Sequence, residues 1–334
     1  MKNHVSIREM VSAHLAGAVV CLMVLLTVMP LSARGRADDG SMQNNAIARQ
    51  GQAKYVFLFI GDGMAMAQIS STEVYATARS SKDISITRLD FTRFPVSGLT
   101  TTYDAGTFIT DSASAITAIA TGNKTLSGVI NMDPAKRQNY KTIAEYAHDA
   151  GMKVGIVSSV TLDHATPAGF FAKVPSRSNY YDIAVQMVQS DFEYFAGGGL
   201  LQPTGKDRDQ RDVIQLAGER GYTYVNDKGA FNALRPGVGK VLAVNAILQD
   251  SGSMPYELDR SGDDLSLADY TRKGIELLDN PQGFFMMVEG GKIDWACHAN
   301  DAGAAIHDVL ALDNAIKEAV AFAQAHPGET LIIV

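Results

Sequence analysis

Acidic side chains stand at the ends of two apolar runs in this 334-residue sequence. Asp62 lies between two glycines, directly after the run "YVFLFI" at residues 55–60, and Glu289 ends a second apolar run that is also followed by two glycines. A carboxylate at the end of a buried strand can face a metal ion or a substrate, and the glycines let the backbone approach either one closely. For Asp62 taken alone, a helix N-cap is an equally good interpretation.

A serine stands at a predicted helix start. Ser112 comes just before the small-residue segment "ASAITAIATG", which we predict to be helical. The free N–H groups and the positive partial charge of a helix start favour phosphate, so Ser112 is a candidate nucleophile whose phosphorylated form the helix would stabilise. The simpler interpretation of this motif alone is an N-cap pair, Asp111 and Ser112. The sequence has no GxSxG motif, which argues against a nucleophile of the α/β-hydrolase type.

Three polar residues follow the apolar run at residues 153–159. His164 and Thr166 fall in a segment that Pro167 restricts, and Arg177 comes eleven residues after Thr166. Arginine suits phosphate because its planar guanidinium donates two parallel hydrogen bonds. Taken singly, His164 and Arg177 are more often solvated loop residues than parts of a site.

An acid and a histidine share a helical spacing near the C-terminus of the sequence. Asp294 and His298 are four residues apart and therefore lie on one face if the segment is helical. A carboxylate and an imidazole at this spacing suit zinc, although for the pair taken alone a surface Asp–His pair is the more common explanation. Cys297 adjoins His298 and would point elsewhere, so we interpret it as a small buried residue and not as a ligand.

The elements that position these residues alternate between strands and helices. Apolar runs predict buried strands at residues 55–60, 153–160, 283–290 and 329–334. Helical spacing of apolar residues is found at residues 141–150, 180–188, 211–220, 267–279 and 302–325. This order predicts an α/β fold with a largely parallel central sheet and helices on both faces. Residues 200–262 are rich in Gly, Asp and Arg and predict a less regular insertion.

The N-terminal segment has the features of an export signal. Residues 1–37 combine a basic start, an apolar stretch and small residues, which predicts a cleaved signal peptide and a periplasmic or secreted protein. The alternative is an uncleaved membrane anchor; after cleavage we expect no stable membrane association. Residues 38–53 would be a flexible lead-in to a domain at 54–334. The formal net charge of −7 argues against a nucleic acid as a specific partner.

Four motifs together resemble the alkaline phosphatase family. They are "FIGDGM", "TDSASAITAIATG", "HATPAGFFAKVPSR" and "VEGGKIDWACHANDA", and they occur in the order found in that family. The resemblance runs from about residue 54 to the last residue. It implies hydrolysis of small phosphate monoesters, two zinc ions, one magnesium ion and a homodimer.

The resemblance also implies a role for each candidate residue. Asp62 would bridge one zinc and the magnesium, and Ser112 would be the nucleophile that becomes phosphoserine. Thr166 and Glu289 would complete the protein ligands of the magnesium. Arg177 would bind the phosphoryl oxygens, and Asp294 and His298 would hold the other zinc. Asp111, His164 and Trp295 would lie beside the direct ligands. His164 and Trp295 place the sequence in the histidine–tryptophan variety of the family.

One departure from the family pattern qualifies this assignment. In the family, the strand matching "ETLIIV" runs into a "TADH" element that supplies two zinc ligands, and a further histidine comes much later. The resemblance therefore implies a C-terminally truncated chain with little or no phosphatase activity of its own. The alternatives are a phosphodiesterase, sulfatase or mutase of the wider superfamily, or a non-catalytic phosphate- or metal-binding fragment. No CxPxR-like sulfatase motif surrounds Ser112.

Overall fold

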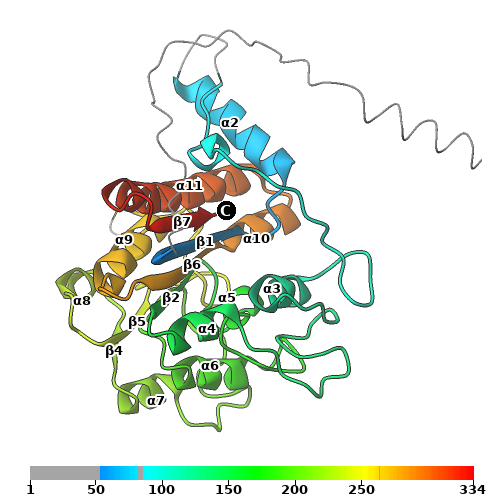
Figure 1. Ribbon diagram of the computed structural model, residues 1–334, viewed down its shortest axis with the longest axis vertical. Coiled ribbons are helices and arrows are strands. Elements are labelled where there is room, and N and C mark those ends of the chain that lie inside the picture. The colour runs from blue at the N-terminus through cyan, green and yellow to red at the C-terminus, as the bar shows by residue number, and fades with distance from the viewer. Residues whose placement is uncertain (1–52, 81–85, 263) are drawn as a thin grey trace, which may run out of the picture. The chain divides into compact units, whose positions relative to one another are not determined.

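A computed structural model describes residues 53–80, 86–262 and 264–334, and the described residues form one compact unit. Its centre is a seven-stranded, all-parallel sheet in the order β4-β5-β3-β2-β6-β1-β7, with helices on both faces (Figure 1). The predicted α/β fold is thus confirmed. The predicted signal peptide and nearly all of the predicted lead-in lie outside the described residues. The strands are β1 (Tyr55–Gly61), β2 (Lys153–Ser158), β3 (Tyr194–Gly197), β4 (Tyr222–Val225), β5 (Lys240–Val244), β6 (Phe284–Gly290) and β7 (Thr330–Ile333).

The middle of the sheet is built from strands that are far apart in sequence. β6 lies between β1 and β2 and pairs with both, and β1 pairs on its outer side with β7. Every residue of β6 is buried, as expected for a parallel strand covered on both faces. In this register Glu289 of β6 lies opposite Ser158 of β2 and Ile60 of β1, so the carboxyl ends of these strands meet at one edge.

Two layers of helices cover the sheet, each over its own hydrophobic cluster. One cluster includes Phe57, Phe59 and Phe284 and lies under α8, α9, α10 and α11, with α2 packed outside α11 (Figure 1). The other includes Phe170, Phe195 and Phe285 and lies under α3, α4, α5, α6 and α7. The helices are α2 (Met66–Ser80), α3 (Ser112–Thr121), α4 (Ile143–Asp149), α5 (Ala165–Ala168), α6 (Tyr180–Gln189), α7 (Val213–Glu219), α8 (Lys228–Ala233), α9 (Leu267–Leu278), α10 (Lys292–His298) and α11 (Ala302–Ala325), with a 3₁₀ turn at Phe91–Arg93.

The expectation of an irregular insertion at residues 200–262 was wrong in part. This segment contains α7, β4, α8 and β5, and the two strands extend the sheet beyond β3. Val241, Leu242 and Ala243 of β5 are completely buried, so this strand is a full member of the core. The two strands are only four and five residues long. The expectation rested on the composition of the whole segment, and Gly- and Asp-rich turns make up most of that composition.

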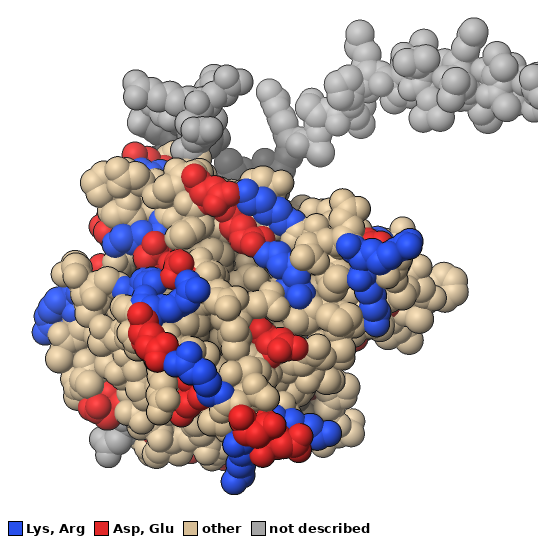
Figure 2. Space-filling view, turned by 90° about the horizontal axis from the view of Figure 1, so that it is seen from below, with Lys and Arg blue, Asp and Glu red and all other residues tan. Residues whose placement is uncertain are grey.

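Two further observations concern the surface. On the face shown in Figure 2, Lys and Arg residues are intermingled with Asp and Glu residues, and no broad basic area is seen there. Among the described helices, none combines the length and the apolar character that a membrane crossing requires.

Candidate active site

The predicted site residues come together at the carboxyl edge of the sheet, around the ends of β1, β2 and β6. All of them except Glu289 line one pocket of about 710 Å³. Glu289 is completely buried at the end of β6, between strands β1 and β2. The topology explains this convergence, because the carboxyl ends of neighbouring parallel strands meet at the same edge.

Ser112 is the first residue of α3, and Asp111 caps this helix. The Asp111 carboxylate accepts a hydrogen bond from Ser114 N at 2.9 Å, and the Ser114 hydroxyl oxygen accepts one from Asp111 N at 3.3 Å, so the two residues form a capping box. The cap explains why the helix begins here. It leaves the Ser112 side chain directed into the pocket, where Oγ donates to Asp62 Oδ2 at 3.0 Å.

Acidic groups face each other in this pocket. Burial raises the pKa of Asp62, and the negative charge of Asp294 raises it further, against the hydrogen bond from Ser112. Burial also raises the pKa of Glu289, and the charge of Asp62 adds to this effect. The Ser158 hydroxyl donates a hydrogen bond to one oxygen, Glu289 Oε2, and lowers the pKa against burial, as does the neighbouring Thr166. The three carboxyl groups therefore repel one another, and this repulsion favours binding of a cation.

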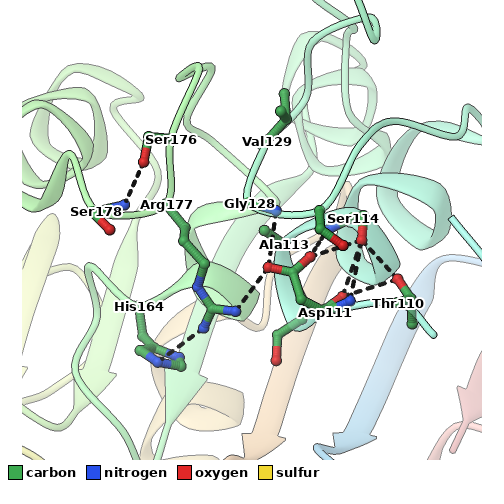
Figure 3. Close-up of polar contacts among 12 residues, drawn as sticks. Thr110, Asp111, Ala113, Ser114, Gly128, Val129, His164, Ser176, Arg177 and Ser178 are labelled. Atoms are coloured by element: carbon green, nitrogen blue, oxygen red, sulfur yellow. Dashed lines mark hydrogen bonds and ion pairs between the residues drawn. The ribbon is translucent and has the colours of Figure 1, made fainter. Parts of the chain in front are cut away.

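The Arg177 guanidinium is held from two sides (Figure 3). It donates to Asp111 Oδ2 at 3.0 Å, and its other terminal nitrogen lies 3.3 Å from His164 Nε2. Because arginine can only donate, Nε2 is the acceptor and His164 is neutral with its proton on Nδ1. Burial and the Arg177 charge lower the pKa of His164 to about 4, which agrees with the neutral form.

Asp111 is the common partner of the helix and the arginine. Burial raises the pKa of its carboxyl group, but hydrogen bonds from Ser114, from Gly128 N and from Arg177 outweigh burial, so the net pKa is lowered. The group is ionised at neutral pH and ties Arg177 to the start of α3.

Asp294 and His298 lie on one face of α10, as their spacing predicts. His298 Nε2 is 3.4 Å from Asp294 Oδ2, and the His298 side chain is 80% exposed. Gly63, in the left-handed conformation at φ +62°, passes so close that an added Cβ would stand 2.7 Å from Asp294 Oδ1. This explains why a glycine follows Asp62. The half-buried Cys297 accepts a hydrogen bond from Gln68 at 3.3 Å.

The donor atoms suit metal ions, although the side chains are not gathered into a tight cluster. Within the described residues, no three His, Cys, Asp or Glu side chains stand close enough together to hold an ion. However, Glu289 Oε1 is buried without any hydrogen-bond partner, as expected for an atom whose partner is a cation. Asp62, Thr166 and Glu289 offer the oxygen ligands that magnesium prefers, while a carboxylate and an imidazole suit zinc.

Reasoning from the sequence missed two polar residues that support the site. Ser158 ends β2 and donates through its hydroxyl to Glu289 Oε2. Lys292 opens α10 and is completely buried, with its ammonium group 2.6 Å from Asp250 Oδ2. The pairing of Ser158 could have been found from the strand register, but nothing in the sequence marks Lys292 as buried.

Comparisons with known proteins agree with this geometry. The family model described as alkaline phosphatase matches residues 53–334. Alkaline phosphatase 3 of Bacillus subtilis is 34% identical over 301 residues, which cover 87% of this chain and 62% of that protein. The tissue-nonspecific isozyme of Gallus gallus is 30% identical, over 85% of this chain and 63% of that protein. The chain thus spans just under two thirds of the length of these relatives.

Solved structures show the same likeness. The alkaline phosphatase of the Antarctic bacterium TAB5 superimposes with a TM-score of 0.72 at 32% identity, over 84% of this chain and 77% of that one. The Thermus thermophilus alkaline phosphatase gives a TM-score of 0.75 at 29% identity, over 91% of this chain and 63% of that one. With the family model matching most of the sequence, the chain belongs to the alkaline phosphatase family.

Proposed function

We propose that this protein hydrolyses phosphate monoesters through a phosphoserine at Ser112, with two zinc ions and one magnesium ion as cofactors. The observation that carries the proposal is the placement of Ser112 at the start of α3, with Oγ 3.0 Å from Asp62 and with Arg177 lining the same pocket. A nucleophile, an anion-binding helix start and a phosphate-binding guanidinium thus face one space.

The first chemical step belongs to Ser112. Asp62 Oδ2 accepts the hydrogen bond of the Ser112 hydroxyl and so orients Oγ into the pocket. A bond forms between Oγ and phosphorus while the bond from phosphorus to the alcohol oxygen breaks, and the proton lost by the Ser112 hydroxyl is balanced by the proton that the departing alkoxide gains as it leaves as the alcohol. Water then hydrolyses the phosphoserine, which releases inorganic phosphate and restores the hydroxyl. Metal ions at this site would supply charge stabilisation and would lower the pKa of the serine hydroxyl and of water.

Arg177 and the helix start hold the phosphoryl group. Asp111 and His164 each engage one terminal nitrogen of Arg177, so the plane of the guanidinium is fixed before substrate arrives. Its remaining N–H groups are available to the oxygens of phosphate. The backbone N–H groups of Ser112 and Ala113 add to this attraction, because the first N–H groups of a helix have no carbonyl partner within it, while Ser114 N is already bound to the Asp111 carboxylate.

The cofactor assignment rests on the ligand types and on one related protein. A variant of the TAB5 enzyme is described with magnesium bound in a site named M3. In this chain Asp62, Thr166 and Glu289 would hold magnesium, Asp62 and Ser112 one zinc, and Asp294 and His298 the other. A periplasmic or secreted location and a homodimer remain predictions from the sequence and from the family resemblance.

The test is a paired assay and a trapping experiment. Hydrolysis of p-nitrophenyl phosphate is measured with and without added zinc and magnesium, on this chain and on any longer product that its gene encodes. Ser112→Ala should lower turnover by several orders of magnitude, and phosphoserine trapped at acidic pH should map to Ser112. As a control, Ser266→Ala removes the N-cap of α9 and should lower stability but not turnover per folded molecule. Trapping of the phosphate on another residue would overturn the assignment.

A further inference from the structure

A buried lysine lies next to the candidate site and has no role in the reaction described above. The Lys292 side chain is completely inaccessible to solvent, which is rare for lysine unless the charge is paired. Its ammonium group lies 2.6 Å from Asp250 Oδ2 and 3.1 Å from Ser253 Oγ. Its backbone N–H donates to Ser159 Oγ at 3.2 Å. The first residue of α10 is therefore fixed through both its backbone and its side chain.

Two aromatic rings flank the same ammonium group. It lies 3.5 Å from the centre of the Tyr256 ring and 5.0 Å from the centre of the Trp295 ring, distances at which a cation is attracted to the ring face. Trp295 in turn meets His164 edge-on, with ring centres 5.8 Å apart. Because His164 Nε2 contacts Arg177, a continuous series of contacts leads from Lys292 to the guanidinium that faces the pocket.

Trp295 borders open space on two sides. A pocket of about 440 Å³ is lined by His164 and Trp295, which also line the candidate active site, so packing does not enclose the indole ring completely. The wall of this pocket includes Asp250 and Ser251, which have the positive φ values of +40° and +66°. Residues other than glycine keep such a conformation only when their surroundings fix them. The ion pair with Lys292 fixes Asp250 in this turn.

We propose that Lys292 is a positioning residue, whose ammonium group fixes Trp295 and, through His164, sets the orientation of Arg177 for phosphate. The part of this inference that concerns phosphate rests on the proposed function, in which Arg177 binds phosphate. A purely structural ion pair would stabilise the fold without affecting Trp295 or phosphate. The two explanations differ in what they predict for the environment of one indole ring.

Trp295 is the only tryptophan in the sequence, so its fluorescence reports on this ring alone. Lys292→Met removes the charge and keeps an unbranched side chain. The matched control is Lys240→Met, because Lys240 makes the same kind of contacts at the start of β5. It lies 2.6 Å from Asp191 Oδ1 and 4.8 Å from the centre of the Tyr222 ring. Each variant is examined by tryptophan emission, by acrylamide quenching and by calorimetric titration with inorganic phosphate.

We expect Lys292→Met to change the emission spectrum, to increase quenching and to weaken phosphate binding by about tenfold, the effect of losing one well-placed interaction. Lys240→Met should change none of these. Lys292→Arg, which keeps the positive charge, should retain most of the phosphate affinity. Unchanged emission and phosphate affinity in folded Lys292→Met, or equal changes in the control, would overturn the proposal.

A second variant keeps the proposal testable if Lys292→Met does not fold. Asp250 is half exposed, so Asp250→Asn is a milder change that removes only the ionic partner of the lysine. It should shift the Trp295 emission in the same direction by a smaller amount, and an unchanged emission spectrum would count against the proposal. If the unaltered protein does not bind phosphate, the proposed function fails, while the emission measurements still decide the role of Lys292.

Discussion

Replacement of Asp111 should destabilise the protein more than the loss of an ordinary helix cap. Its carboxylate accepts a hydrogen bond from Ser114 N, a second from Gly128 N at 3.0 Å, and an ion pair from Arg177 at 3.0 Å. Asp111→Ala removes all three contacts at once. They join the start of α3, the loop at Gly128 and the segment that carries Arg177, so no single neighbour can compensate for the loss.

The expected size of the effect follows from these contacts. Loss of an N-cap costs about 1 kcal/mol. The Gly128 N–H, left without an acceptor in a partly buried position, costs about 1–2 kcal/mol. The ion pair joins side chains that are each 26% exposed, so its loss adds less than about 1 kcal/mol. Asp111→Ala should therefore lower the free energy of unfolding by about 3 kcal/mol, and Asp111→Asn, which keeps one acceptor oxygen, by an intermediate amount.

The assay is urea unfolding followed by circular dichroism. The control is Asp227→Ala in α8, since Asp227 caps its helix by accepting a hydrogen bond from Ala230 N at 2.8 Å. This control should cost about 1 kcal/mol. If Asp111→Ala costs no more than Asp227→Ala, the contacts to Gly128 and Arg177 contribute nothing, and the reasoning from additive contacts is refuted.

Three further predictions concern the site and the core. Arg177→Ala should weaken binding of inorganic phosphate by about tenfold or more, because charge-assisted hydrogen bonds are lost, while zinc content measured by mass spectrometry stays the same; loss of zinc with unchanged phosphate affinity would contradict this. Glu289→Gln should lower the magnesium content but leave the metal-free protein at least as stable in thermal unfolding. The reason is that an uncharged amide replaces a buried carboxyl group that lacks a full set of hydrogen-bond partners. A less stable metal-free variant would argue against a cation site there. Burial raises the pKa of Asp308 to about 7, so its proton is held more tightly in the folded state than in the unfolded chain, and stability should fall as pH rises from about 4 to 7. Asp308→Asn should flatten this dependence in urea titrations at several pH values, and an unaltered slope would exclude Asp308 as its source.

The strands in the middle of the sheet could be predicted because parallel strands covered on both faces are long apolar runs. β1, β2 and β6 were all predicted in this way. β3, β4 and β5, with four or five residues each, were missed because these short runs lie among Gly- and Asp-rich turns and do not stand out from them. The helix α2 was also missed, since its sequence "MAQISSTEVYATARS" has a weak apolar stripe and buries only Thr72.

The candidate site was predictable to a different degree. The residue types after each strand indicated an anion or metal site, but the role of each residue came from the family motifs and not from the spacing. The sequence could not show that His164 is neutral, because that depends on its burial beside Arg177. Nor could it show that Lys292 is buried, because lysine is usually exposed and its partners lie on a loop about forty residues earlier in the sequence.

The order of strands has a consequence for how the protein is made. Of the described strands, β1 is the first to leave the ribosome, yet its only partners in the described sheet are β6 and β7, more than two hundred residues later. Tyr55, Phe57 and Phe59 are thus synthesised long before the strands that cover their edges exist. Until those strands emerge, the nascent chain exposes this aromatic segment, and an exposed apolar strand edge is prone to aggregation. The centre of the sheet can close only after residues 284–290 have emerged, because β6 is the strand that joins β1 to β2.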